Sequence, residues 1–136
     1  MIKKYKRKEV FRFAFNPPLD AQFAVLVNGR KIDRMMHPCK IIDISPRGMK
    51  IFTDVDILKN YHYPPDLLQF EMHFVLDITK IQAIGHVRWS KAYANGAYFG
   101  LLFRNQPGIE ELIVSELKRR RRKEVFAKKH VDFRQF

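Results

Sequence analysis

The sequence has a single cysteine, Cys39, and no long uninterrupted apolar segment. One cysteine excludes an internal disulfide framework and favours a reducing compartment. No stretch approaches the roughly 18 to 20 apolar residues that a membrane-spanning helix needs. The apolar segment after the basic start is interrupted by Arg12 and by the Asn-Pro-Pro of residues 16–18, which disfavours a signal peptide. We therefore expect a cytoplasmic protein.

Sequence patterns of enzymes and metal sites are also missing. The chain has no glycine-rich phosphate loop of the Walker type, and Ser90 and Ser115 have no base partner at a catalytic spacing. His37 and Cys39 are two candidate soft ligands, but a structural zinc site needs four, and no second pair stands at metal-binding spacing. We expect no catalytic residues, no metal and no cofactor.

What the chain has in excess is positive charge, and this charge is concentrated at both ends. The net charge is +12, from 26 Lys and Arg against 14 Asp and Glu. Residues 1–12 carry six of the cations and residues 118–136 carry nine, whereas residues 13–117 carry eleven cations and eleven acids. An anion-binding function should therefore involve the termini. The unbroken cationic run at 118–123 is either a solvated helix end or a contact for acidic protein, nucleic acid or an anionic membrane surface.

Most of the chain between these ends alternates apolar and polar residues with the period of a strand. We expect six strands, at residues 21–27, 39–44, 49–53, 67–76, 80–89 and 98–103, and an irregular crossover with one helical turn at 55–66. The alternation places Asp43 on one face with Cys39 and Ile41. It also places Trp89 on the core face with Val87, which favours core packing over a role as a stacking platform for bases.

Six short strands without intervening helices predict an all-β fold, a six-stranded antiparallel, Greek-key-like β-barrel whose closure protects its edges. The chain then changes to helical period, because four apolar residues form one stripe suited to pack on the barrel; these are Ile109, Leu112, Ile113 and Leu117. We divide the chain into a flexible basic N-terminal arm (1–17), the barrel with the start of the helix (18–117) and a basic helical extension that projects into solvent (118–136).

The segment 43–48, Asp-Ile-Ser-Pro-Arg-Gly, connects two of the expected strands. Its ordinary interpretation is a tight turn, in which Asp43 and Ser45 bond backbone amides, Pro46 fixes φ and Gly48 supplies a positive φ. On turn chemistry alone, no function is needed to explain this segment.

The same turn, in its context, resembles a known family. An Asp-x-Ser-x-x-Gly turn between two strands, preceded by an N-terminal Arg-x-x-x-Arg pattern, is typical of PilZ domains, and Asp43, Ser45, Gly48 and Arg12 match it. Gly-His-Val-Arg-Trp at 85–89 and Tyr-Phe-Gly-Leu-Leu-Phe at 98–103 are similar to later strands of the family, which also ends in a helix. The resemblance covers about residues 7–117.

The resemblance implies binding of cyclic dimeric GMP (c-di-GMP) in a bacterium. Arginines of the N-terminal arm would meet guanine edges and phosphates, because the fork of a guanidinium matches both. Asp43 would accept hydrogen bonds from the N1–H and N2 amino groups of guanine, with Ser45 at the same rim. Gly48 would let the base or the backbone approach without a Cβ clash.

One position departs from the family pattern. The four-residue spacing from Arg12 falls on Lys8, which keeps the charge but lacks the guanidinium fork, and Arg7 stands one position earlier as a substitute. The expected ligand-binding residues are therefore Arg7, Lys8, Arg12, Asp43, Ser45 and Gly48.

Three functions follow from these features. The first is a c-di-GMP sensor whose arm closes over the ligand. Because we expect no output domain in these 136 residues, the changed surface would regulate a partner protein or act through self-association, as in a homodimer. The second is a PilZ-like protein-interaction module that has lost nucleotide binding, which the departure at Lys8 favours. The third is a barrel that carries two cationic ends for RNA, DNA or acidic lipid.

Overall fold

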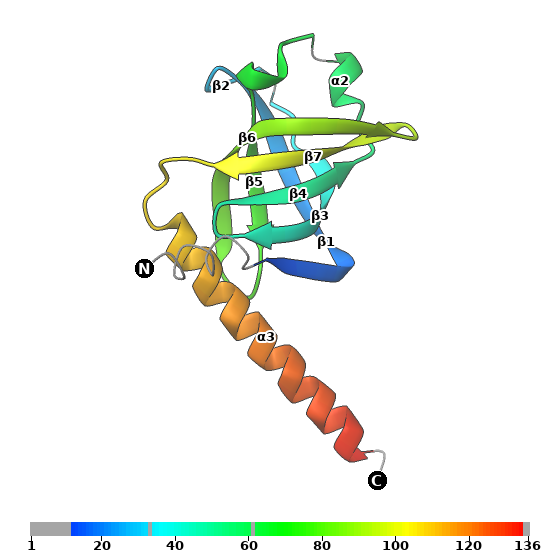
Figure 1. Cartoon of the computed structure of the whole chain (residues 1–136), viewed down its shortest axis with the longest axis vertical. Helices are drawn as coiled ribbons and strands as arrows, with labels where there is room; N and C mark the ends of the chain where they lie inside the picture. Colours follow the sequence, from blue (N-terminus) through cyan, green and yellow to red (C-terminus); the bar gives the residue numbers. More distant parts are fainter. Residues whose placement is uncertain (1–11, 33, 61, 135–136) are drawn as a thin grey trace, which may run out of the picture.

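The computed structural model of the chain describes residues 12–32, 34–60 and 62–134, and shows a barrel of strands from which one long helix departs (Figure 1). The strands are β1 (Phe13–Val27), β2 (Arg30–Lys31), β3 (His37–Ser45), β4 (Gly48–Thr53), β5 (Leu68–Val75), β6 (Lys80–Tyr93) and β7 (Gly96–Phe103). The helical elements are α2 (Ile57–Asn60), the 3-10 turn η1 (Pro65–Leu67) and α3 (Ile109–Arg134). Because β1 begins at Phe13, residues 13–17 belong to the barrel and not to the arm in which the sequence placed them.

The sheet closes on itself through its first strand. The strands pair in the order β1-β3-β4-β7-β6-β5, and β1 also pairs with β5, with every pairing antiparallel. The long β1 serves both neighbours, because residues 13–14 and 19–23 pair with β3 and residues 22–27 pair with β5. The predicted six-stranded antiparallel barrel with a C-terminal helix is thus confirmed, and the two-residue β2 is an addition that pairs with β1.

Aromatic side chains from three strands form the centre of the core. Phe23 of β1, Phe70 of β5 and Phe99 of β7 are fully buried. Ring centroids are 4.6 Å apart for Phe23 and Phe70 and 4.9 Å apart for Phe70 and Phe99. Ile113 and Leu117 of α3 pack against the same core, as the helical stripe predicts. Burial of each such side chain stabilises the fold by about 1.5–3 kcal/mol, so one continuous core holds the barrel and the first half of α3 together.

A buried carboxylate fixes α3 to the turn between β5 and β6. Glu116 is 1% exposed, and its Oε1 accepts hydrogen bonds from the three consecutive backbone N–H groups of residues 77–79, at 3.1, 3.1 and 2.9 Å. Three backbone donors on one carboxylate oxygen compensate part of its charge and offset part of the cost of burying it. The position of α3 on the barrel is therefore set by polar contacts as well as by apolar packing.

The cationic run at 118–123 is partly anchored. Arg120 Nη1 donates to the carbonyl oxygen of Leu76 at 2.9 Å, and Lys123 Nζ donates to Asp77 Oδ1 at 2.7 Å. The expectation that the whole run projects into solvent is therefore wrong for Arg120, whose side chain is 29% exposed, whereas Lys123 pairs with Asp77 and stays mostly exposed. Beyond them α3 continues away from the barrel to Arg134 (Figure 1).

Candidate functional site

A bulge in β3 decides where the side chain of Asp43 lies. The pairing of β3 with β4 shifts register between Ile41 and Asp43, so β3 holds one extra residue at this point. Beyond the bulge the alternation of faces is reversed: Ile44 is fully buried, and Asp43 borders a pocket on the outside of the barrel. The sequence prediction that Asp43 shares a face with Cys39 and Ile41 is therefore wrong.

A second bulge, in β6, turns Trp89 outward. The pairing of β6 with β7 shifts register between Val87 and Trp89, with Arg88 as the extra residue. Val87 is 6% exposed and faces the core, whereas Trp89 is 45% exposed and borders the same outer pocket as Asp43. The predicted core position of Trp89 is wrong because one inserted residue moves every later side chain to the opposite face.

The indole ring of Trp89 lies over the backbone of β7 at Gly100, its pairing partner. A Cβ atom at Gly100 would overlap the ring atoms Nε1, Cε2 and Cδ1 of Trp89. The absence of a side chain at Gly100 therefore gives the ring its place on the outer surface, where one side faces the sheet and part of it remains open.

The outer pocket, which we call the strand pocket, has a volume of about 400 Å³ and crosses four neighbouring strands. Its lining comes from the residue before β1, the end of β3, the β3–β4 turn, β4, β6 and β7. The lining residues are Arg12, Asp43, Ser45, Arg47, Gly48, Met49, Lys50, Arg88, Trp89, Gly100, Leu101 and Leu102. Four of the six residues that the family resemblance selects lie in this one pocket, and the other two, Arg7 and Lys8, lie outside the described residues.

Arg12 and Asp43 meet at the rim of the strand pocket. Arg12 Nη1 lies 3.5 Å from Asp43 Oδ1, and their side chains are 62% and 17% exposed. An arginine so exposed can leave this pair at little cost, because an ion pair at the surface contributes about 0–1 kcal/mol. The contact places Arg12 beside the pocket, although the two residues are far apart in the sequence.

Ser45 and Gly48 close the turn between β3 and β4. The Ser45 hydroxyl donates to the carbonyl oxygen of Gly48 at 3.4 Å, which is a long and therefore weak hydrogen bond. Gly48 does not have the positive φ that the sequence predicts. It must be glycine for another reason, since a Cβ atom there would overlap the carbonyl oxygen of Leu101 in β7.

The strand pocket is strongly cationic. Arg12, Arg47, Lys50 and Arg88 line it, and Asp43 is the one carboxylate among its lining residues. The Lys50 ammonium also lies 5.1 Å from the centre of the Tyr98 ring, which holds it above the outer face of the sheet. Four cations, one acceptor and an open aromatic face suit a planar ligand that carries more than one negative charge.

Sequence reasoning missed three of the residues that complete the pocket, namely Arg47, Arg88 and Trp89. Arg47 sits inside the predicted turn, where its side chain is not needed to form the turn. Trp89 was hidden by the β6 bulge, because strict alternation assigns it to the core face. Arg88 is exposed on the polar face to which the alternation assigns it, but nothing in the alternation marks it as a binding residue. One signal could have located Trp89 on the outer face. A large aromatic residue on one strand and a glycine on the next can pair, because the glycine leaves room for the ring.

Metal binding, thiol reactivity and membrane spanning can each be checked against the residues that the structure describes. No three His, Cys, Asp or Glu side chains there are grouped so that they would hold a metal ion. Burial, reinforced by the charge of Asp20, raises the pKa of the Cys39 thiol to about 12, which keeps this thiol protonated and unreactive near neutral pH. No described helix is both long and apolar enough to span a membrane.

Comparison with known proteins identifies the family. The family model of the PilZ domain matches residues 4–119, and the chain belongs to the PilZ domain family. A solved structure of the PilZ domain of YcgR from Escherichia coli with c-di-GMP is 16% identical, with a TM-score of 0.54 over 85% of this chain and 94% of that chain. The crystal structure of YcgR from Escherichia coli in complex with c-di-GMP is 15% identical, with a TM-score of 0.52 over 86% of this chain.

The chain spans only about half of the longer YcgR structure, 48% of its length. At these identities the likeness concerns the fold. No curated protein matches the chain.

Proposed function

We propose that this PilZ domain is a c-di-GMP-binding module rather than an enzyme, and that the strand pocket is its ligand site. The observation that carries the proposal is the gathering of Arg12, Asp43, Ser45 and Gly48 around one cationic pocket of about 400 Å³. These four residues match the family pattern, and the fold brings them together from separate parts of the sequence.

Each part of the ligand finds a suitable group in the strand pocket. The two phosphates, with one negative charge each, favour the guanidinium groups of Arg12 and Arg88. Asp43 is an acceptor for the N1–H and N2 amino donors of a guanine edge, a pair of donors that adenine lacks. Trp89, with its open ring, is placed to stack on a purine face.

Arg12 directly precedes β1 and lines the strand pocket, so it stands where the N-terminal segment meets the proposed ligand site. In the unliganded protein it neutralises Asp43. We infer that the ligand replaces this contact, so that Asp43 binds guanine and Arg12 binds phosphate. Arg7 and Lys8 would approach from the segment that precedes Arg12, and this segment would close over the ligand. The altered surface would then regulate a partner protein.

Titration calorimetry on the full chain at tens of micromolar protein tests the proposal. We expect c-di-GMP to bind, with cyclic di-AMP as the ligand control that fails to do so. Arg12→Ala and Asp43→Asn each remove one charged contact, worth about 1–3 kcal/mol, which corresponds to a loss of about 5- to 150-fold in affinity. Arg30→Ala is the matched control, because Arg30 is an exposed arginine of β2 that does not line the pocket.

Absence of heat with c-di-GMP, or unchanged binding by Arg12→Ala, would reject the assignment. Gly48→Ala is unsuitable as a test, because its Cβ would disturb the contact with Leu101 whether or not a ligand binds.

A second candidate is a protein-interaction module that does not need nucleotide. Two observations favour it: Lys8 stands where the family pattern has arginine, and Arg12 and Asp43 already satisfy each other's charge. Binding of a partner protein with equal affinity in the presence and absence of c-di-GMP, together with a silent calorimetric titration, would establish this alternative.

A further inference from the structure

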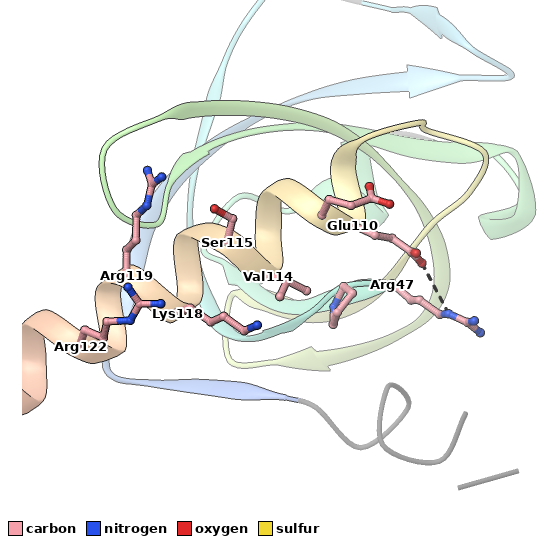
Figure 2. A pocket seen from close by; sticks show the side chains of 9 residues that line it. Arg47, Glu110, Val114, Ser115, Lys118, Arg119 and Arg122 are labelled. Carbon is pink, nitrogen blue, oxygen red and sulfur yellow. Dashed lines mark ion pairs between the residues drawn. The ribbon is translucent and has the colours of Figure 1, made fainter. Parts of the chain in front are cut away.

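Arg47 belongs to two hollows at once. The first is the strand pocket. The second, which we call the α3 groove, has a volume of about 540 Å³ and lies between the β3–β4 turn and α3 (Figure 2). Its lining residues are Pro46, Arg47, Glu110, Glu111, Val114, Ser115, Lys118, Arg119 and Arg122. Arg47 is the single residue shared by these two linings, so its side chain stands at the border between the pocket and the helix.

The backbone of Arg47 is held in place, while its side chain is half open. Its carbonyl oxygen accepts a hydrogen bond of 2.7 Å from the backbone N–H of Phe103. Its Nε lies 3.6 Å from Glu110 Oε1, and the two side chains are 51% and 49% exposed. Figure 2 shows this ion pair between the turn and the first turn of α3. A fixed backbone with a long exposed side chain allows Arg47 to change partner by rotating alone, without movement of the barrel.

We propose that Arg47 is a further ligand-binding residue and that the ligand competes with Glu110 for it. The inference rests on the proposed function, because it takes c-di-GMP as the ligand of the strand pocket. A phosphate accepts two parallel hydrogen bonds from a guanidinium, whereas the pair with Glu110 is exposed and longer than a hydrogen bond. Binding therefore shifts Arg47 from the helix to the ligand.

The exchange changes the charge of the α3 groove. Without ligand, Arg47 compensates Glu110 at the end of the groove where α3 begins. With ligand, Glu110 and Glu111 remain there as two carboxylates without Arg47, while Lys118 and Arg122 are unchanged at the other end. The ligand thereby makes the start of α3 more acidic, and this change carries the signal from the pocket to a surface that does not touch the ligand.

Removing the carboxylate of Glu110, which competes with the ligand for Arg47, should strengthen ligand binding. In calorimetric titrations of the full chain with c-di-GMP at about 0.15 M salt, Glu110→Gln should bind about 2- to 5-fold more tightly than wild type, since the exposed pair no longer opposes the exchange. Glu111→Gln is the matched control. It removes the same charge from the same helical turn, but no ion pair among the described residues joins Glu111 to Arg47, so its affinity should equal that of wild type.

The Glu110→Gln change made in an Arg47→Ala background separates the effect of the Arg47–Glu110 ion pair from a general effect of charge on ligand affinity. Arg47→Ala should weaken binding, and adding Glu110→Gln to Arg47→Ala should produce no further change. Equal affinities of wild type, Glu110→Gln and Glu111→Gln would overturn the competition while leaving the proposed function intact. A wild type that gives no heat would overturn the proposed function, and the competition with it. Circular dichroism melts of all variants establish that each is folded.

Discussion

Replacement of Trp89 by alanine is the sharpest perturbation of the strand pocket that leaves its charges unchanged. Trp89 is 45% exposed and its ring lies on Gly100, so loss of the ring removes an outer wall of the pocket and little of the core. Stacking of a base on an aromatic side chain contributes about 1–3 kcal/mol, so Trp89→Ala should weaken c-di-GMP binding about 5- to 150-fold. Trp89→Phe keeps a smaller ring and should lose less.

The assay is direct because Trp89 is the only tryptophan in the chain. Stacking of guanine on the indole should quench its fluorescence, with a midpoint equal to the calorimetric Kd of the wild type. Tyr93→Ala is the control: Tyr93 is an exposed aromatic residue of the same strand, but it does not line the pocket and should have no effect. Wild-type affinity in Trp89→Ala, or unchanged fluorescence at saturation, would refute the stacking role.

The remaining predictions concern stability. Glu116→Ala leaves three backbone N–H groups without their acceptor and should lower the free energy of unfolding, measured by urea denaturation, by about 3 kcal/mol. Glu124→Ala, which removes only an exposed ion pair with Arg120 on the same helix, should cost about 0.5 kcal/mol or less. Equal losses would contradict the anchoring role. Burial raises the pKa of Glu71, but the hydrogen bond with His73 and the nearby cations outweigh it and hold this pKa below the ordinary 4.5. The resulting stabilisation is complete above pH 4.5 and is lost as the pH falls through the lower folded pKa. The stability difference between wild type and Glu71→Gln should therefore shrink in urea titrations toward pH 3, and a constant difference would contradict it.

The barrel was predictable because its strands alternate faces and its core is built from apolar residues at that period. Phe70 and Met72 of β5, and Ile81 and Ala83 of β6, lie inside as the alternation requires. Arg12, Asp43, Ser45 and Gly48 were identified through their family resemblance. Their gathering in one pocket could be learned only from the fold, which brings strands distant in sequence side by side.

Three features were not predictable, each for a physical reason. Bulges carry no reliable signal in a single sequence, and the two at Asp43 and Trp89 reverse the expected faces. Glu116 has the residue type and the helical position of a surface carboxylate, and its burial depends on three amides from a distant turn. Arg47 lines both the strand pocket and the α3 groove because α3 lies close to the β3–β4 turn. No local sequence pattern encodes this approach.

A crystal structure of the full chain grown with saturating c-di-GMP would test the central assignment most directly. We expect a guanine edge on the carboxylate of Asp43, a purine face on the indole of Trp89 and a phosphate on the guanidinium of Arg12. A nucleotide seated elsewhere on the barrel, or an Arg12–Asp43 ion pair that persists with no nucleotide beside it, would contradict the account.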